Sequence, residues 1–416
     1  MDFSSTLDLL WIVISGILVF FMQAGFTLFE AGLTRSKNMA NIAMKNFVDL
    51  FVGAIAFWGV GYSLMYGDSF NGLVGEVSAF YIEENDMHNL FFQTVFCATA
   101  ATIISGAIAE RAKFMTYVAF SFLFTTFLYP VAGHWVWQAD GWLTNIGFVD
   151  FSGATVVHVM GGFAALMYAW ILGPRYDKYS SEGKVNFIGG HNYMFSVLGV
   201  FILWMGWFGF NAGSTLAITG DSSNVVPLVI LNTNLSGSMG GICALLITKI
   251  KYKKADIAMT LNGTLAGLVG ITAGCSIVDP LGAIVMGGVC GIIVTLMSEV
   301  VERKFKIDDA VSAFSVHGIS GLVGTILVGV FSTDNGLLYG GGPYQLIIQV
   351  IGAFSVALWS VVVTSVLVLT LKYTVGIRVP LKHEKIGLDN VEHNIYFNTT
   401  IERKVDKPLI FDEDEE

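Results

Sequence analysis

Long apolar runs separated by short polar segments make up most of the chain. Runs of about 20 apolar residues predict helices that cross a lipid bilayer. The pattern predicts an all-α polytopic membrane protein with eleven transmembrane helices, near residues 8–32, 47–67, 89–109, 114–133, 153–172, 192–214, 226–248, 256–276, 281–301, 311–331 and 345–371. The longer intervals 68–88 and 134–152 are predicted as outer loops, and the polar sequence from about 376 onward as a tail without a helical pattern.

The composition supports the membrane class. Of the 416 residues, 54% are hydrophobic and only 13% are charged, which is more apolar than a soluble domain of this length. The 47 Gly against 7 Pro fit tightly packed transmembrane helices, in which small residues let backbones approach. A net charge of −10 gives no support to nucleic-acid binding. The four cysteines show no metal-type spacing and do not support a disulfide framework, and we expect neither a cofactor nor enzymatic activity.

The placement of the charges predicts the orientation in the bilayer. All 22 Lys and Arg residues are expected in alternate loops or in the tail, for example near Arg35, Arg111 and Arg303. The other loops carry acids such as Asp68 and Asp140 and no basic residue. Because basic residues mark the cytoplasmic side, we expect a plasma (inner) membrane protein with its N-terminus outside and its C-terminus in the cytoplasm.

Two stretches place a histidine and an acid in the apolar sequence. They read DFSGATVVHVMGG and DAVSAFSVHGISG, and in both the acid precedes the histidine by eight residues, from Asp150 to His158 and from Asp309 to His317. Eight residues span about 12 Å of helix, so each pair can lie on related faces of one helix. A single histidine of this kind is more often an interhelical hydrogen bond. A matched pair in two halves of the chain indicates an inverted-repeat transporter or channel.

Imidazole suits the handling of a proton or a small polar solute, since one ring nitrogen donates while the other accepts. Two such rings in contact could share a proton through an N–H···N bond. The acids have simpler explanations. A helix cap is the expected role of Asp309, whereas for Asp150 a cap and an effect on an outer cation site are both open.

Aromatic residues gather near the predicted outer ends of the spans, in WFGFNAGS (207–214), FFQTVF (91–96) and HWVWQADGW (134–142). Such residues often form an interfacial belt, and Trp135 and Trp142 fit that interpretation. Aromatic faces also bind cations, more strongly when the cation is desolvated. A tryptophan, a phenylalanine and a serine hydroxyl around one hollow would accept a small cation that donates hydrogen bonds.

Taken together, these motifs resemble the ammonium transporter family (Amt/Mep, related to the Rh proteins). The similarity extends from FMQAGFTLFEAGLTRSKN (21–38) to GIRVPLKHEKIGLDNVEH (376–393), and its most specific pieces are DFSGATVVHV, GWFGFNAGS, AGLVGIT and SVHGISGLVG. The resemblance implies eleven helices in two inverted, pseudo-symmetric halves. It also implies a transmembrane domain over 1–376, a cytoplasmic tail over 377–416, and a homotrimer in the lipid bilayer with one pore per protomer.

The resemblance further implies roles for individual residues. The outer ammonium-recruitment site would be formed by Trp137, Ser214, Phe96 and Asp150. The gate would be the stacked pair Phe96 and Phe210. The pore would be lined by His158, His317, Trp207 and Thr272. Trp135 or Trp142 could take the place of Trp137, because the spacing from Trp137 to Asp150 differs by one residue from the family pattern.

The function implied is a transporter or channel that recruits NH4+, deprotonates it and passes NH3 along the two histidines. An alternative is an Amt-type sensor that binds ammonium and signals through its tail or a partner, a reading suggested by FMQAGFTLFE with Glu30 inside the first span. A third is a gas or water channel without ammonium recruitment. The family also implies a PII-type regulator or neighbouring protomers at the tail, although Asn394 stands where the family usually has glycine.

Overall fold

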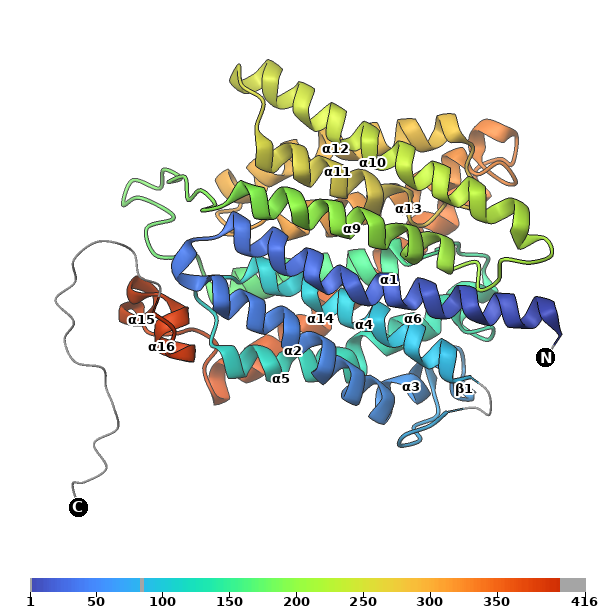
Figure 1. The fold of residues 1–416 in the computed structure, drawn as a ribbon, viewed down its shortest axis with the longest axis horizontal. Helices are drawn as coiled ribbons and strands as arrows, with labels where there is room; N and C mark the ends of the chain where they lie inside the picture. Colours follow the sequence, from blue (N-terminus) through green and yellow to red (C-terminus); the bar gives the residue numbers. More distant parts are fainter. Residues whose placement is uncertain (1, 83–85, 397–416) are drawn as a thin grey trace.

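The helices of the computed structural model run along one common direction, with the N-terminus at one end of the bundle and the short helices α15 and α16 at the other (Figure 1). The structure describes residues 2–82 and 86–396. We call the two ends of the bundle the N-terminal face and the tail face. The acidic end of the predicted tail, residues 397–416, lies outside the described residues.

Sixteen α-helices form the described part of the chain, joined in several places by π-helical or 3₁₀ turns. The α-helices are α1 (Phe3–Leu33), α2 (Met39–Ala56), α3 (Tyr62–Tyr66), α4 (Met87–Ala107), α5 (Phe114–Leu123), α6 (Tyr129–Trp137), α7 (Trp142–Asn145), α8 (Met160–Leu172), α9 (Tyr193–Gly213), α10 (Ser222–Tyr252), α11 (Ile257–Ile271), α12 (Pro280–Arg303), α13 (Ser320–Phe331), α14 (Tyr344–Thr374), α15 (Leu381–Ile386) and α16 (Leu388–His393). The other elements are η1 (Ser36–Asn38), η2 (Phe57–Gly61), η3 (Phe124–Leu128), η4 (Ala154–Val159), η5 (Phe314–Ile319), η6 (Leu337–Tyr339), β1 (Ser69–Phe70) and β2 (Val74–Gly75).

The predicted spans all have helical counterparts. Within the described residues, ten helical stretches are long and apolar enough to cross a membrane. The remaining predicted span corresponds to α11, a shorter apolar helix of 15 residues. The all-helical, multi-span fold expected from the hydropathy pattern is therefore confirmed.

Three local predictions were wrong. The second span begins with α2 at Met39 and not near 47, so Lys45 is buried within a helix and does not lie in a loop. Asn41, Lys45 and Asp49 follow each other at four-residue spacing and put their polar groups on one buried face of α2. The predicted loop 134–152 contains the end of α6 and all of α7, and the tail forms α15 and α16.

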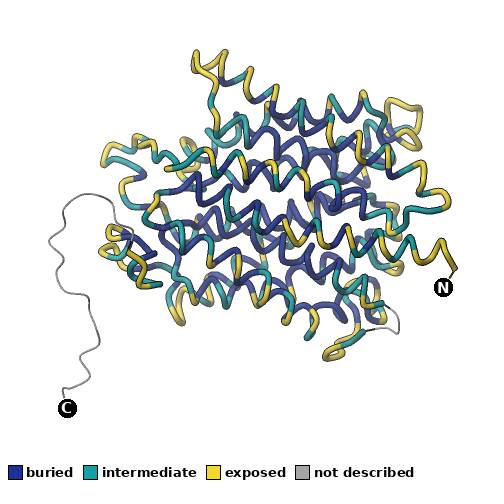
Figure 2. Tube along the Cα trace, viewed as in Figure 1, coloured by how far each residue is buried: buried dark blue, intermediate teal, exposed yellow. Residues whose placement is uncertain are grey.

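Buried residues fill the interior of the bundle, while exposed residues gather at its ends and along its periphery (Figure 2). Large apolar side chains remain exposed along the shafts of several long helices; examples are Phe20, Phe21, Phe47, Trp170, Phe201 and Leu358. Since a soluble monomer rarely exposes extensive apolar surface, this pattern fits helices surrounded by lipid.

Candidate functional site

The first histidine segment begins at a buried acid that holds the start of η4. The Asp150 carboxylate accepts backbone N–H groups from Gly153 (3.0 Å) and Ala154 (2.7 Å) on one oxygen, and from Thr155 (2.8 Å) and Val156 (3.2 Å) on the other. The Thr155 hydroxyl donates to it as well. Gly153 has φ 94°, a conformation that glycine adopts without strain. Asp150 therefore caps the helix from outside, and the expectation that acid and histidine share one helix was wrong.

The second histidine segment has a weaker version of the same anchor. The Asp309 carboxylate accepts the N–H groups of Ala313 (2.9 Å) and Phe314 (2.8 Å) at the start of η5. This confirms the expected capping role of Asp309. In both segments the histidine follows within a π-helical turn, a feature that is frequent at functional sites.

The two histidines meet inside the protein. Nδ1 of His158 lies 3.2 Å from Nδ1 of His317, and the ring planes are 23° apart. At this distance the N–H of one ring donates a hydrogen bond to the Nδ1 atom of the other. His158 is fully buried and His317 is 4% exposed. Among the described residues, Nε2 of His158 has no hydrogen-bond partner, so this nitrogen is available to a small polar solute.

Glycines allow this approach of the two histidine segments. A Cβ placed on Gly162 would lie 2.2 Å from the backbone nitrogen of Gly318, and one placed on Gly321 would lie 2.6 Å from the carbonyl oxygen of Ala154. Any larger residue at either position would force the backbones apart. The separation of the imidazole rings is thus set by backbone contact.

Aromatic rings stack from the N-terminal face down to His158. Phe96 on α4 and Phe210 on α9 stack with centroids 4.0 Å apart and planes 16° apart. Phe210 lies 5.5 Å from the His158 ring, and Trp207 stacks on the same imidazole at 5.1 Å. The Trp207 indole N–H donates to the Thr272 hydroxyl at 3.1 Å, which fixes the orientation of that ring.

Of the three tryptophans considered for the outer site, Trp137 is the one beside the stacked pair. Its ring lies 6.3 Å from Phe96, and its indole N–H donates to the carbonyl oxygen of Asp150 at 2.8 Å. Trp135 and Trp142 pack against each other at 5.9 Å. The Asp150 segment therefore positions both η4 and Trp137.

Ser214 follows α9 at the same end of this column. Its hydroxyl donates to the carbonyl oxygen of Phe210 at 2.9 Å, so the oxygen lone pairs remain free to accept further hydrogen bonds. The structure thus brings the predicted residues together in one column from Ser214 and Trp137 to His317.

A comparison with protein families decides the family. Residues 10–396 match the model of the Ammonium Transporter Family. The chain belongs to the ammonium transporter family. It is therefore a multi-pass membrane protein of a transport family and not an enzyme.

Relatives of this Amt-type chain cover nearly its whole length. It is 42% identical over 412 residues to ammonium transporter Amt2 of Archaeoglobus fulgidus, covering 93% of this chain and 87% of that protein. It is 35% identical over 402 residues to ammonium transporter 3 of Dictyostelium discoideum, with 93% of each chain covered.

Solved structures agree with the fold of this Amt-type chain. A sensor Amt protein superposes with a TM-score of 0.88 at 40% identity, covering 93% of this chain and 98% of that chain. Mep2 of Candida albicans superposes with a TM-score of 0.82 at 29% identity, covering 90% of this chain and 86% of that chain.

Two hollows of this Amt-type protein border the second histidine segment. The larger has a volume of about 330 Å³ and is lined by polar groups that include Arg175, Asn262, Asp309, Ser312 and Ser315. The smaller, of about 10 Å³, is bordered by residues of α1 and α4 and of the second histidine segment; among them are Phe26, Phe29, Glu30, Val311 and His317. Val311 borders both hollows.

The walls of the smaller hollow were missed when the pore was predicted from the sequence. Phe26 lies 6.1 Å from the His317 ring, measured between centroids. The first span showed Glu30 as a notable acid, but nothing in the sequence indicated that its helix packs beneath the second histidine. Only the three-dimensional packing of α1 against the histidine segment brings Glu30 to this wall.

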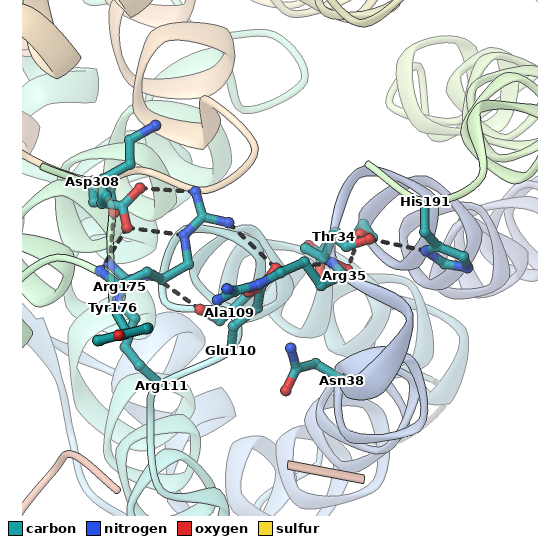
Figure 3. Close-up of polar contacts among 12 residues, drawn as sticks. Thr34, Arg35, Asn38, Ala109, Glu110, Arg111, Arg175, Tyr176, His191 and Asp308 are labelled. Atoms are coloured by element: carbon teal, nitrogen blue, oxygen red, sulfur yellow. Dashed lines mark hydrogen bonds and ion pairs between the residues drawn. The ribbon is translucent and has the colours of Figure 1, made fainter. Parts of the chain in front are cut away.

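An ion-pair network joins the loops at the tail face (Figure 3). The Arg175 guanidinium donates to both oxygens of Asp308 at 2.9 Å and to Glu110 at 3.3 Å, and Arg35 also pairs with Glu110. Burial alone would raise the pKa of the Asp308 carboxyl, but the charges of Arg175 and Arg111 outweigh it and hold that pKa well below its usual range. Asp308 is thus ionised at neutral pH and fixes the residue before Asp309.

The tail helices are held at the same face by contacts of their own. Glu384 accepts the N–H of Tyr176 and pairs with Arg378 at 2.7 Å. Asp389 accepts the N–H of Asn41 at 2.7 Å. These contacts attach α15 and α16 to the start of α2 and to the loop after α8.

The tail position that departs from the family pattern keeps a glycine-like backbone. Asn394 ends α16 with φ 54° and ψ 36°, in the left-handed region. After glycine, asparagine is one of the residues that adopts this conformation most readily. The helix end is therefore preserved despite the substitution.

Proposed function

We propose that the protein transports ammonium by recruiting NH4+ at its N-terminal face, deprotonating it and passing NH3 along the two histidines. The observation that carries this proposal is the 3.2 Å contact between His158 and His317 directly below the stacked pair Phe96 and Phe210. The acidic loops and the positive-inside pattern support an external N-terminal face and a cytoplasmic tail face.

Recruitment uses the group at the top of the column. The Trp137 and Phe96 rings offer aromatic faces to a cation, and the Ser214 hydroxyl can accept a hydrogen bond from NH4+. Asp150 acts as a positioning residue, because its carboxylate is occupied by four backbone N–H groups and a hydroxyl. It holds the indole of Trp137 through its carbonyl oxygen.

Deprotonation explains selectivity. A bare cation would lose its hydration between Phe96 and Phe210, at a cost of several kcal/mol. Losing a proton converts NH4+ into a neutral molecule that crosses the apolar passage and meets Nε2 of His158, which has no hydrogen-bond partner among the described residues. K⁺ has no proton to lose, so it is rejected at the same constriction.

The protein further works as a homotrimer in the bilayer, with the tail as the contact for a PII-type regulator. The preserved left-handed end of α16 at Asn394 supports this tail role. A pull-down with a PII-type protein at varied nucleotide and 2-oxoglutarate concentrations tests the partner, and mass photometry in detergent tests the trimer.

A second candidate function is that of an ammonium sensor. The solved structure of a sensor Amt protein is 40% identical to this chain over 93% of its length. In that case ammonium would bind at the Trp137–Ser214 site and change the tail, with little or no flux. Tight ammonium binding without flux in liposomes favours the sensor.

The deciding experiment is ammonium-evoked current and uptake in proteoliposomes. The wild type should show both, and the double variant His158→Ala with His317→Ala should lose selective ammonium transport. His88→Ala, a histidine at the start of α4 outside the aromatic column, is the matched control and should behave like the wild type. Selective ammonium conduction at the wild-type rate by the double variant would falsify the proposal.

A further inference from the structure

Glu30 is a carboxylate inside the first membrane-spanning helix that the proposed route does not use. It lies on α1, is 2% exposed, and contributes to the wall of the smaller hollow together with His317. An acid at membrane depth is costly, so a functional role is its default explanation. Its position below the histidine pair suggests what that role is.

The hydrogen bonds around Glu30 leave a place for one proton. Oε2 of Glu30 lies 2.5 Å from the Ser105 hydroxyl and 3.2 Å from Nδ2 of Asn46. The same hydroxyl lies 2.6 Å from Oδ1 of Asn46. A serine hydroxyl carries only one hydrogen, so with Glu30 ionised one of the two short contacts of Ser105 has no proton in it. Protonation of Glu30 supplies the missing hydrogen and completes the ring of three residues.

The second carboxylate oxygen, Oε1, takes no part in this ring and is the one available to a water molecule. The hydrogen bonds that Asn46 and Ser105 make to the Glu30 carboxylate both go to Oε2. A Cβ on Gly106 would lie 2.8 Å from Oε1, so the glycine leaves the space that the carboxylate occupies. The hollow of about 10 Å³ has room for about one water molecule. One water there would join the imidazole of His317 to Glu30.

Other charges nearby do not share this position. Lys45 on α2 is fully buried and its Nζ has no hydrogen-bond partner among the described residues; it lies 5.7 Å from the centre of the Tyr117 ring. Asp49, one turn further along α2, accepts the hydroxyls of Tyr117 and Ser121 at 2.5 Å each. Asp49 does not border the hollow, so it provides a buried carboxylate for comparison.

An exit toward the tail face is short. Glu30 lies three residues before the end of α1 at Leu33, about 5 Å along the helix axis. Val311 borders both the smaller hollow and the larger one of about 330 Å³, whose lining includes polar side chains such as Asn262, Ser312 and Ser315. A proton released from Glu30 therefore reaches a polar space close to the cytoplasm.

We infer that Glu30 is the acceptor that carries the proton of ammonium away from the histidine pair. The inference rests on the proposed transport function. NH4+ gives NH3 and a proton; the proton passes through the imidazoles and one water to the Glu30 carboxylate, forming the neutral acid. The acid releases the proton into the larger hollow, where NH3 takes it up again. Each cycle moves one NH4+ and one positive charge.

The test is Glu30→Gln in proteoliposomes, read by two signals: ammonium-evoked current and the pH of the interior, reported by a trapped dye. Removing the acceptor should lower the current by about tenfold or more. NH3 should still pass, so the interior should become alkaline faster than in the wild type. Glu30→Asp keeps a carboxylate and should restore part of the current.

Asp49→Asn is the matched control and should keep the wild-type current, since it removes a buried carboxylate outside the hollow. Ser105→Ala keeps the Glu30 carboxylate and tests the site should Glu30→Gln not yield folded protein; it should reduce the current with NH3 passage retained. Wild-type current in Glu30→Gln, or alkalinisation without current in the wild type, overturns the inference while transport stands. Absence of both signals in the wild type, relative to protein-free liposomes, refutes the proposed function itself.

Discussion

His158 packs against the rings of Trp207 and Phe210, whereas His317 faces Phe26 and a small hollow that Glu30 also borders. The two imidazoles come from segments of similar sequence and similar local fold, yet one is enclosed by aromatic rings and the other borders a polar group. The difference teaches that the two similar segments bring the rings into contact, while the neighbouring helices determine the different surroundings of each ring.

The two capping acids, Asp150 and Asp309, also differ in the number of hydrogen bonds they accept. The Asp150 carboxylate satisfies four N–H groups and one hydroxyl, whereas Asp309 satisfies two N–H groups. The first segment is therefore held more firmly at its start. It also carries Trp137 through the carbonyl oxygen of Asp150.

The largest effect should come from removing these anchors. Asp150→Ala leaves five buried donors without an acceptor and should lower the free energy of unfolding by on the order of 4 kcal/mol, against about 1–2 kcal/mol for Asp309→Ala. Unfolding in mixed micelles with a rising fraction of SDS measures both values. Equal losses for the two variants would contradict the comparison.

A smaller effect should separate the two glycines at the crossing. A methyl group on Gly162 meets the backbone of Gly318 at 2.2 Å, whereas one on Gly318 meets first the Phe314 side chain at 2.7 Å. A side chain can move aside and a backbone cannot. Gly162→Ala should cost about 3 kcal/mol and Gly318→Ala about 1 kcal/mol.

The same micelle titration, together with ammonium flux, measures this difference. Gly162→Ala should also slow transport, because it separates the imidazoles. A Gly162→Ala variant as stable and as active as Gly318→Ala would show that the two segments are free to move apart.

The smallest effect should come from the aromatic side of His158. Thr272→Val leaves the buried Trp207 indole N–H without its acceptor and should cost about 1 kcal/mol. Thr272→Ser retains the hydroxyl and serves as the control. Thermal unfolding followed by tryptophan fluorescence measures both variants; no change in Thr272→Val relative to Thr272→Ser would mean that this bond does not hold the ring.

The sequence predicted the helices well because membrane spans depend on local apolar runs, which can be read without knowledge of the fold. The prediction of the second span failed at Lys45, which was placed in a loop. The polar residues around it lie at helical spacing on α2 and face the interior. Averaged hydropathy does not distinguish such a polar helix face from a loop. At the start of η4 a cap was one of the two roles left open for Asp150, but the turn at Gly153 with positive φ, which places Asp150 outside the helix, was not predicted.

Within the site, the matched spacing of acid and histidine correctly drew attention to both segments. The column from Trp137 to His158 was assembled by resemblance and not by spacing. The place of Glu30 could not be found either way, since it depends on how α1 packs beneath the second half of the chain. Contacts between distant helices are the information that one sequence does not carry.

The crossing of main chains at Gly162 and Gly318 limits how the passage can be altered. Because main chain touches main chain at Gly162 and Gly318, the width of the passage is fixed by the backbone. Side-chain substitutions therefore cannot change it. Shrinking either imidazole would leave a gap that the surrounding helices are unable to close. A passage for a bulkier solute would require a different backbone contact between the two segments, because replacing a histidine ring would not widen it.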